Sequence, residues 1–297
     1  MVQVYYFSIK THIKSSAVSF LLFRFSLYNT YTVLSITPIA SGSKGNCTLV
    51  RTENTSVLVD IGIPLFYVEE CLQKINVAPK EIGAVLVTHE HGDHIGGVRA
   101  FAVKYGTPVY ASASAASRIK IKLGQTVSRR FSQFQGNDFF VGDITVSPFP
   151  LCHDVPCTGY SFLCGGEKIS MLTDAGAVDD ILLKRIADSD AVLIEANHDV
   201  DMLKASKKYP AVLKRRILSS QGHLSNAVCG AAILKLALGG VARRFILAHL
   251  SMENNYPELA LSAVISALST HNLKDGRDVY LTVAEQYKVG NTVRAGV

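Results

Sequence analysis

Side chains that can bind metals are concentrated in one short segment of this chain. Three histidines and one aspartate fall within the six residues after Thr88: His89, His91, Asp93 and His94. In an extended chain His89 and His91 point to the same side, because side chains alternate with a period of two. Neutral imidazoles and a carboxylate suit a borderline divalent cation such as zinc or manganese. A solvated polar loop is the alternative, but it does not explain this density of ligand types directly after an apolar run. The segment therefore predicts a metal site.

Three further side chains of the same kind follow apolar segments elsewhere: His153, Asp174 and His249. Taken alone, each would be interpreted as a capping or surface residue. Together they repeat the placement of the first cluster, and sites in open α/β sheets form at the ends of strands. We therefore expect them to belong to the same site.

Strands and helices alternate in the segments that must position these side chains. Apolar runs predict strands at residues 33–39, 48–50, 57–59, 82–88, 143–146, 158–164, 168–173, 191–195, 245–248 and 278–283. Helical periodicity, with proline and glycine at the boundaries, predicts helices at residues 66–75, 95–105, 226–238 and 257–270. This order, with hairpins mixed in, predicts an α/β protein with a mixed sheet.

Composition excludes several classes of protein. The 297 residues are 48% hydrophobic and 18% charged, which argues against disorder and suffices for a substantial core. The six cysteines include no CxxC pair, so a disulfide scaffold is disfavoured. Reduced, buried thiols in a cytoplasmic protein are the favoured interpretation.

Residues 1–32 differ from the rest of the chain, because they are aromatic and basic and contain no acidic residue. Their apolar stretch at residues 17–27 is interrupted by Arg24 and is shorter than the roughly 20 residues of a membrane-spanning helix. Neither a signal peptide nor a transit peptide fits well. We expect an N-terminal extension that is poorly ordered or not native, then a single domain over residues 33–297, with no membrane association.

Net charge gives little information about partners. Of the formal charge of +6, residues 1–52 carry +5, so the other 245 residues have a net charge of only +1. Two local basic runs contain no acidic residue, and each is either a solvated helical face or a contact for a phosphate backbone. These runs are Lys204, Lys207, Lys208, Lys214, Arg215 and Arg216, and Arg118, Lys120, Lys122, Arg129 and Arg130. The first run closely precedes His223, which favours nucleic acid.

The order HEHGDH, His153, Asp174 and His249 resembles the metallo-β-lactamase fold superfamily, from about residue 33 to about residue 283. Five further blocks make the resemblance narrower. They are SGSKGNC at 41–47, EANHD at 195–199, the Tyr-Pro to Arg-Arg segment at 209–216, GHLSN at 222–226 and AHLSMENN at 248–255. They are similar to the YycJ/WalJ branch, a group described as metal-dependent exonucleases that act on DNA.

The resemblance implies an αββα sandwich of two mixed sheets flanked by helices, with two divalent metal ions, zinc or manganese. Carried over by position, one ion would be bound by His89, His91 and His153, and the other by Asp93, His94 and His249. Asp174 would bridge the two ions. Asp60 would support the ligands from behind, although it could equally cap a turn before Gly62.

Two neighbouring metal ions can provide a hydroxide that attacks phosphorus, but the leaving alkoxide still needs a proton. His223 is the candidate acid, because the ligand positions are filled without it and resembling nucleases have a histidine here. Glu195 matches an acidic residue that would orient and charge that imidazole. Alternatively, His223 or Ser225 only caps the next helix. His198 and Asp199 either shape the substrate entrance or cap the segment that follows.

We therefore expect a metal-dependent hydrolase that cleaves phosphodiester bonds in nucleic acid, as a DNA exonuclease, with DNA favoured over RNA and no obligate protein partner. One alternative is a thioesterase or lactonase of the glyoxalase II type, and another is an RNA-processing nuclease. A nuclease with an inserted β-CASP domain is disfavoured, because only 48 residues separate Asp174 from His223.

Overall fold

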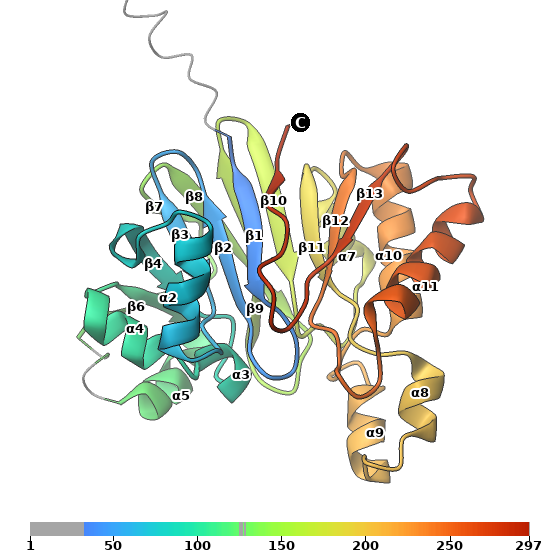
Figure 1. Cartoon of the computed structure of the whole chain (residues 1–297), viewed down its shortest axis with the longest axis horizontal. Coiled ribbons are helices and arrows are strands. Elements are labelled where there is room, and N and C mark those ends of the chain that lie inside the picture. Colours follow the sequence, from blue (N-terminus) through green and yellow to red (C-terminus); the bar gives the residue numbers. More distant parts are fainter. Residues whose placement is uncertain (1–32, 125–126, 128, 297) are drawn as a thin grey trace, which may run out of the picture. The chain divides into compact units, whose positions relative to one another are not determined.

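Two seven-stranded sheets form the centre of the molecule (Figure 1). The computed structural model describes residues 33–124, 127 and 129–296, so the predicted extension at residues 1–32 lies outside it. The first sheet has the order β14-β1-β2-β3-β4-β5-β6 and the second has the order β13-β12-β11-β10-β9-β8-β7. Each sheet is antiparallel on one side and parallel on the other, so both are mixed.

The strands of the first sheet are β1 (Ser35–Ala40), β2 (Cys47–Arg51), β3 (Ser56–Val59), β4 (Ile82–Leu86), β5 (Val109–Ser112), β6 (Phe131–Phe134) and β14 (Val293–Arg294). Those of the second are β7 (Phe139–Val141), β8 (Ile144–Leu151), β9 (Cys157–Cys164), β10 (Glu167–Leu172), β11 (Ala191–Glu195), β12 (Arg244–Ala248) and β13 (Tyr280–Val283). The helices are α2 (Leu65–Lys74), η1 (Pro79–Glu81), α3 (Gly92–Ile95), α4 (Val98–Tyr105), α5 (Ala113–Leu123), α7 (Asp180–Ile186), α8 (Val200–Ala205), α9 (Ala211–Ile217), α10 (Asn226–Gly239) and α11 (Pro257–Ser269).

The molecule has four layers, helices, sheet, sheet and helices, because the strands are buried on both of their faces. In β3, Val57 and Val59 pack into the core between the sheets, whereas Leu58 packs into an outer core with α2, α4 and α5. In β12, Ile246 faces the central core, whereas Leu247 packs with α7, α10 and α11. Because both faces are covered, such strands are continuous apolar runs without polar alternation. The predicted αββα sandwich is confirmed, and Figure 1 shows the two helical layers on opposite sides of the sheets.

The helix predicted at residues 95–105 is wrong at its start, because the chain forms two helices there. The segment breaks at Gly96 and Gly97 between α3 and α4. The amide of Gly97 donates to Ile61 O at 2.7 Å, and a Cβ on Gly97 would lie 2.2 Å from Ile63 O. This close approach to the loop after β3 turns the chain, so α4 begins at Val98.

Several elements were not predicted. They are η1, β5, β6, β7, β14, α5, α7, α8 and α9. The strands among them have two to four residues and lie toward sheet edges, so they need no long apolar run.

All six cysteines, which lie in the described part of the chain, are free thiols. Among the described residues, none of the helices has the length and apolar character needed to cross a membrane.

Gly62 sits where the loop after β3 meets the segment that carries the histidine cluster. A Cβ on Gly62 would lie 1.7 Å from the carbonyl oxygen of Asp93. We expect Gly62→Ala to lower the free energy of unfolding by at least about 2 kcal/mol, because backbone must move to make room. Urea denaturation measures this change.

The matched control is Gly83→Ala, where the added Cβ would have only ordinary contacts at 3.7 Å. It should change the free energy of unfolding by about 1 kcal/mol or less. Equal effects of the two substitutions would contradict the steric argument.

Candidate metal centre

The C-terminal ends of several strands meet at one edge of the two sheets and bring the predicted site residues together. Asp60 directly follows β3, and His89 follows β4 by three residues. Glu195 is the last residue of β11, and His249 directly follows β12. His153 lies two residues beyond the end of β8, and Asp174 lies two residues beyond the end of β10. The strand-end placement expected from the sequence thus gathers side chains that are far apart in the chain.

His89, His91 and His153 form the first cluster, with one nitrogen of each ring within 4.8 Å of the others. Nδ1 of His153 lies 3.2 Å from Gly222 O, and Nδ1 of His89 lies 3.0 Å from Thr88 Oγ1. The Nε2 atoms of His89 and His153 are buried and make no hydrogen bond. Buried polar atoms normally have a partner, so inward-facing nitrogens without one fit a bound cation.

Asp93, His94 and His249 form the second cluster, again with ligand atoms within 4.8 Å. Oδ2 of Asp93 lies 3.5 Å from His94 Nε2 and 3.6 Å from His249 Nε2. Two donors bound to one tetrahedral zinc ion at about 2.0–2.1 Å lie about 3.4 Å apart. The spacing of this cluster therefore matches donors that share one ion.

Asp174 lies between the two clusters. One of its carboxylate oxygens is 3.0 Å from His94 Nε2, and the other is 3.7 Å from His249 Nε2 and 3.9 Å from His153 Nε2. The residue is buried and has a left-handed backbone, with φ of 59°. This position allows its two oxygens to face both clusters.

Two buried carboxylates orient the histidines of the second cluster. Asp60 accepts hydrogen bonds from His94 Nδ1 at 2.7 Å and from the amide and hydroxyl of Thr88. Glu195 accepts from His249 Nδ1 at 2.7 Å. Each contact leaves Nε2 as the atom that faces Asp93 and Asp174, which is the arrangement typical of carboxylate–histidine–metal chains.

Several carboxylates lie against the histidine rings of the second cluster. Burial lowers the pKa of His89, so that ring is neutral at pH 7. Burial also disfavours the charged forms of His94 and His249, but neighbouring carboxylates, Asp174 above all, outweigh it. The pKa of His249 rises to about 10, and that of His94 rises well above its usual value. A divalent cation at these rings would replace their protons.

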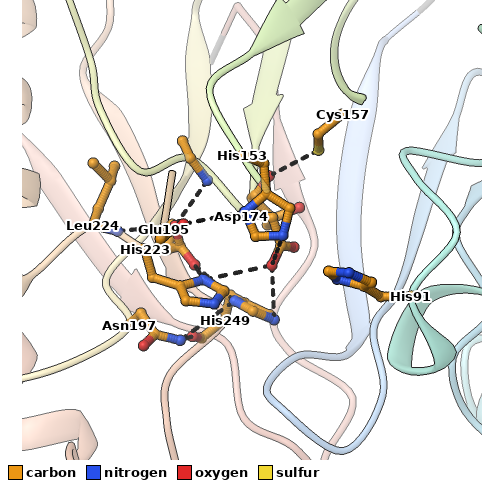
Figure 2. A network of polar contacts seen from close by, with 12 residues as sticks. His91, His153, Cys157, Asp174, Glu195, Asn197, His223, Leu224 and His249 are labelled. Atoms are coloured by element: carbon orange, nitrogen blue, oxygen red, sulfur yellow. Dashed lines mark hydrogen bonds and ion pairs between the residues drawn. The ribbon is translucent and has the colours of Figure 1, made fainter. Parts of the chain in front are cut away.

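His223 lies beside these clusters and is bound to Glu195. Its Nδ1 is 2.8 Å from Glu195 Oε1 and 3.5 Å from Asp174 Oδ1 (Figure 2). Ligand atoms of Asp174, Glu195, His223 and His249 also lie within 4.8 Å of one another. However, the Glu195 oxygens accept from both rings and from the amides of Ala175 and Leu224, so hydrogen bonds account for this carboxylate.

Helix capping is performed by other residues than His223. Ser225 caps α10 by accepting a hydrogen bond from the amide of Val228 at 3.3 Å. Asp199 caps α8 by accepting from Met202 at 2.8 Å. His198 is buried, and neither of its ring nitrogens makes a hydrogen bond. Burial lowers the pKa of His198 to about 4.

The two basic runs differ in their contacts. In the second run, Arg118 Nη1 binds the Glu90 carboxylate at 3.1 Å, and Lys122 Nζ donates to Glu90 O at 2.8 Å. These contacts hold the histidine segment against α5, so Arg118 and Lys122 have a structural role. In the first run, Arg216 Nη1 binds Asp154 Oδ2 at 2.6 Å, which places the run beside His153.

Sequence reasoning missed several residues of this site. Thr88 binds Asp60 and His89, and Cys157 Sγ lies 3.7 Å from His89 Nδ1. Asn46 Nδ2 lies 3.2 Å from His94 Nε2. The SGSKGNC block, which contains Asn46, carried a signal only as part of a resemblance, because hydroxyl and amide groups are too common to indicate a site by type.

Comparison with known proteins agrees with this geometry. The family model of the metallo-beta-lactamase superfamily matches residues 40–223. Exodeoxyribonuclease WalJ of Streptococcus pneumoniae is 38% identical over 244 residues, covering 81% of this chain and 90% of that protein. Exodeoxyribonuclease YycJ of Bacillus anthracis is 35% identical over 237 residues, covering 79% of this chain and 89% of that protein.

Solved structures show the same fold. The metallo-beta-lactamase fold protein YhfI from Bacillus subtilis superposes with a TM-score of 0.67 at 17% identity, over 89% of this chain and 100% of that one. The sheets, the sequence matches and the fold therefore agree, and this chain belongs to the metallo-beta-lactamase superfamily, in the branch that contains WalJ and YycJ.

Proposed function

We propose that this protein is a dinuclear-metal hydrolase that removes nucleotides from the ends of DNA. The observation that carries the proposal is the His223–Glu195 pair, which places an imidazole next to the metal-binding clusters without belonging to either three-residue set. Phosphodiester cleavage needs such a proton donor for the leaving oxygen. Two relatives that cover most of this chain are named exodeoxyribonucleases, which favours DNA over RNA.

The ligands in this proposal are the clusters described above. His89, His91 and His153 would hold one ion, Asp93, His94 and His249 would hold the second, and Asp174 would offer an oxygen to each. When bound, two divalent ions, zinc or manganese, supply an activated water and neutralise charge that builds on the phosphate. Asp60 and Glu195 fix the ring orientations of His94 and His249 through their Nδ1 atoms.

His223 supplies the proton in this proposal. Glu195 holds Nδ1, so Nε2 is the atom left to donate to the leaving oxygen. The same Glu195 oxygen also binds His249 Nδ1 at 2.7 Å, so proton donor and metal ligand share one buried anion. This shared contact keeps His223 at a fixed distance from the second cluster.

Substrate binding involves the first basic run. Arg215 and Arg216 are exposed on α9, and Arg216 reaches Asp154 beside the first cluster. Cations at this edge can contact the phosphates that lead into the site. We further propose that residues 33–297 form the catalytic domain and that it works in the cytoplasm, where its free cysteines stay reduced.

The decisive experiment offers purified, metal-loaded protein several substrates side by side. They are linear duplex and single-stranded DNA labelled at the 5′ or the 3′ end, closed circular DNA, structured RNA, and a thioester. We expect release of nucleotides from linear DNA, none from circular DNA, and loss of all activity after chelation. Thioester hydrolysis without nucleotide release would overturn the proposal. Cleavage of RNA alone would support the same mechanism with RNA, not DNA, as the substrate.

Removal of the proton donor should separate chemistry from metal binding. We expect His223→Ala to lower kcat on linear DNA by about 10²–10⁴-fold, because the leaving oxygen loses its acid. Bound metal, measured by elemental analysis, should stay at the wild-type stoichiometry. His271→Ala, which alters an exposed histidine, is the control and should leave kcat unchanged. Loss of metal in His223→Ala would contradict the assignment.

The pH dependence of kcat tests the role of Glu195. Burial lowers the pKa of His223, but Glu195 raises it by more, so the net pKa lies above the usual value of 6.5. The acid form is therefore present below that raised pKa and is lost as pH rises through it. We expect Glu195→Gln to move the alkaline fall of kcat to lower pH, because the anion that stabilises the imidazolium is gone.

Glu69→Gln, on helix α2, is the matched control and should leave the profile unchanged. Metal content is measured in parallel, because Glu195 also binds His249. An alkaline limb that stays in place or moves to higher pH, with metal retained, would show that Glu195 does not charge His223.

A further inference from the structure

A carboxylate outside the predicted ligand set faces the first histidine cluster. Asp154 directly follows His153, and its Oδ1 lies 3.2 Å from His153 Nε2 and 3.5 Å from His91 Nε2. Both Asp154 Oδ1 and His153 Nε2 are buried, and neither makes a hydrogen bond. A buried carboxylate oxygen without a donor is costly. These atoms therefore point to a cation that they share.

The distances around Asp154 match those of the second cluster. There, Asp93 Oδ2 lies 3.5 Å and 3.6 Å from the Nε2 atoms of His94 and His249. Donors on one tetrahedral ion lie about 3.4 Å apart. The distances from Asp154 Oδ1 to the two histidine nitrogens are therefore close both to this value and to those around Asp93. By distance to its histidines, Asp154 is placed as well as Asp93 is.

Arg216 determines which way the Asp154 carboxylate turns. Its Nη1 donates to Asp154 Oδ2 at 2.6 Å, from helix α9 and 62 residues away in sequence. One oxygen is thereby occupied, and the other is directed at His91 and His153. The guanidinium thus orients the carboxylate toward the cluster and does not cover the oxygen that faces it.

We propose that Asp154 is a direct ligand of the ion bound by His89, His91 and His153. This inference rests on the metal centre of the proposed function and extends its ligand set by one residue. Carboxylate donors suit manganese, whereas imidazoles suit zinc and several other transition metals. Asp154 therefore raises the affinity of this site for manganese more than its affinity for zinc.

The test measures metal binding to the full chain, first stripped of metal. Asp154→Asn keeps the shape of the side chain and removes its charge. Calorimetric titration with Mn²⁺ should show one of the two equivalents weakened by about 10–100-fold or more, since even substitutions behind a ligand have effects of this size. Zn²⁺ should be weakened less. Asp180→Asn, an exposed carboxylate on α7, is the control and should titrate like wild type.

A second variant reports coordination directly. Asp154→Cys places a thiolate at the same position, and Co²⁺ should then produce a sulfur-to-cobalt charge-transfer band that wild type and Asp180→Cys lack. Circular dichroism and thermal melting confirm that each variant folds. Unchanged or tighter Mn²⁺ binding by Asp154→Asn, or no charge-transfer band in Asp154→Cys, would overturn the proposal and mean that Asp154 only pairs with Arg216.

The two proposals fail separately. If Asp154→Asn binds Mn²⁺ more weakly as expected but the wild-type protein has no nuclease activity, the proposed function is refuted and the ligand assignment stands. An active nuclease whose Asp154→Asn variant binds both equivalents normally would refute the ligand assignment alone.

Discussion

Hydrogen bonds from the Nδ1 atoms of buried histidines are the interactions on which the site depends. The rings of His94 and His249 are held by carboxylates, and that of His153 lies against a backbone carbonyl. Each bond fixes the tautomer and turns Nε2 inward, so the buried rings present one set of atoms to a shared centre. Without the supporting carboxylate a buried ring would lose the hydrogen bond that fixes its orientation.

The fold supplies these partners by ending strands of two sheets at one edge. Three site residues adopt left-handed backbone there: Asp60 at φ 57°, Asp174 at φ 59° and His249 at φ 57°. Such conformations cost free energy for residues other than glycine, and they occur where surrounding contacts impose them. The His249 amide donates to Ser41 Oγ at 2.7 Å, and the Asp60 amide donates to Leu86 O at 2.8 Å. Hydrogen bonds from their amides to neighbouring segments thus hold both residues in place.

Charge in this protein acts locally. Arg118 and Lys122 hold the Glu90 segment, so these two cations are explained by structure. Arg216 contacts a carboxylate beside the first cluster, so its run reaches the site. Cations in the two acid-free runs therefore have different contacts, about which net charge carries no information.

Local patterns in the sequence predict the α/β class and the placement of ligand-type residues after strands, whereas the αββα sandwich and the role of each site residue came only from the family resemblance. Apolar runs place most of the central strands within a residue or two, since strands such as β11 and β12 are buried on both faces. The exception is β8, which continues five residues past its predicted end at Val146, through Pro148 and Pro150. Short strands such as β7 and basic helices such as α9 lack such a run and were missed. The helix predicted at residues 95–105 is too long at its start. The break before α4 depends on contacts of Gly97 with Ile61 and Ile63, which lie in another segment.

By itself, the sequence determined which residue types stand after which strands, and so the histidines and aspartates that gather at one edge. Tertiary structure alone decided how each of them is used. Asp154 and Asp60 are the same residue type, yet Asp154 faces the Nε2 atoms of the first cluster and Asp60 holds Nδ1 of His94 in the second. Glu195 was expected beside His223, and the structure adds that it also holds His249. These differences depend on angles and distances between segments far apart in the chain, which no local pattern contains.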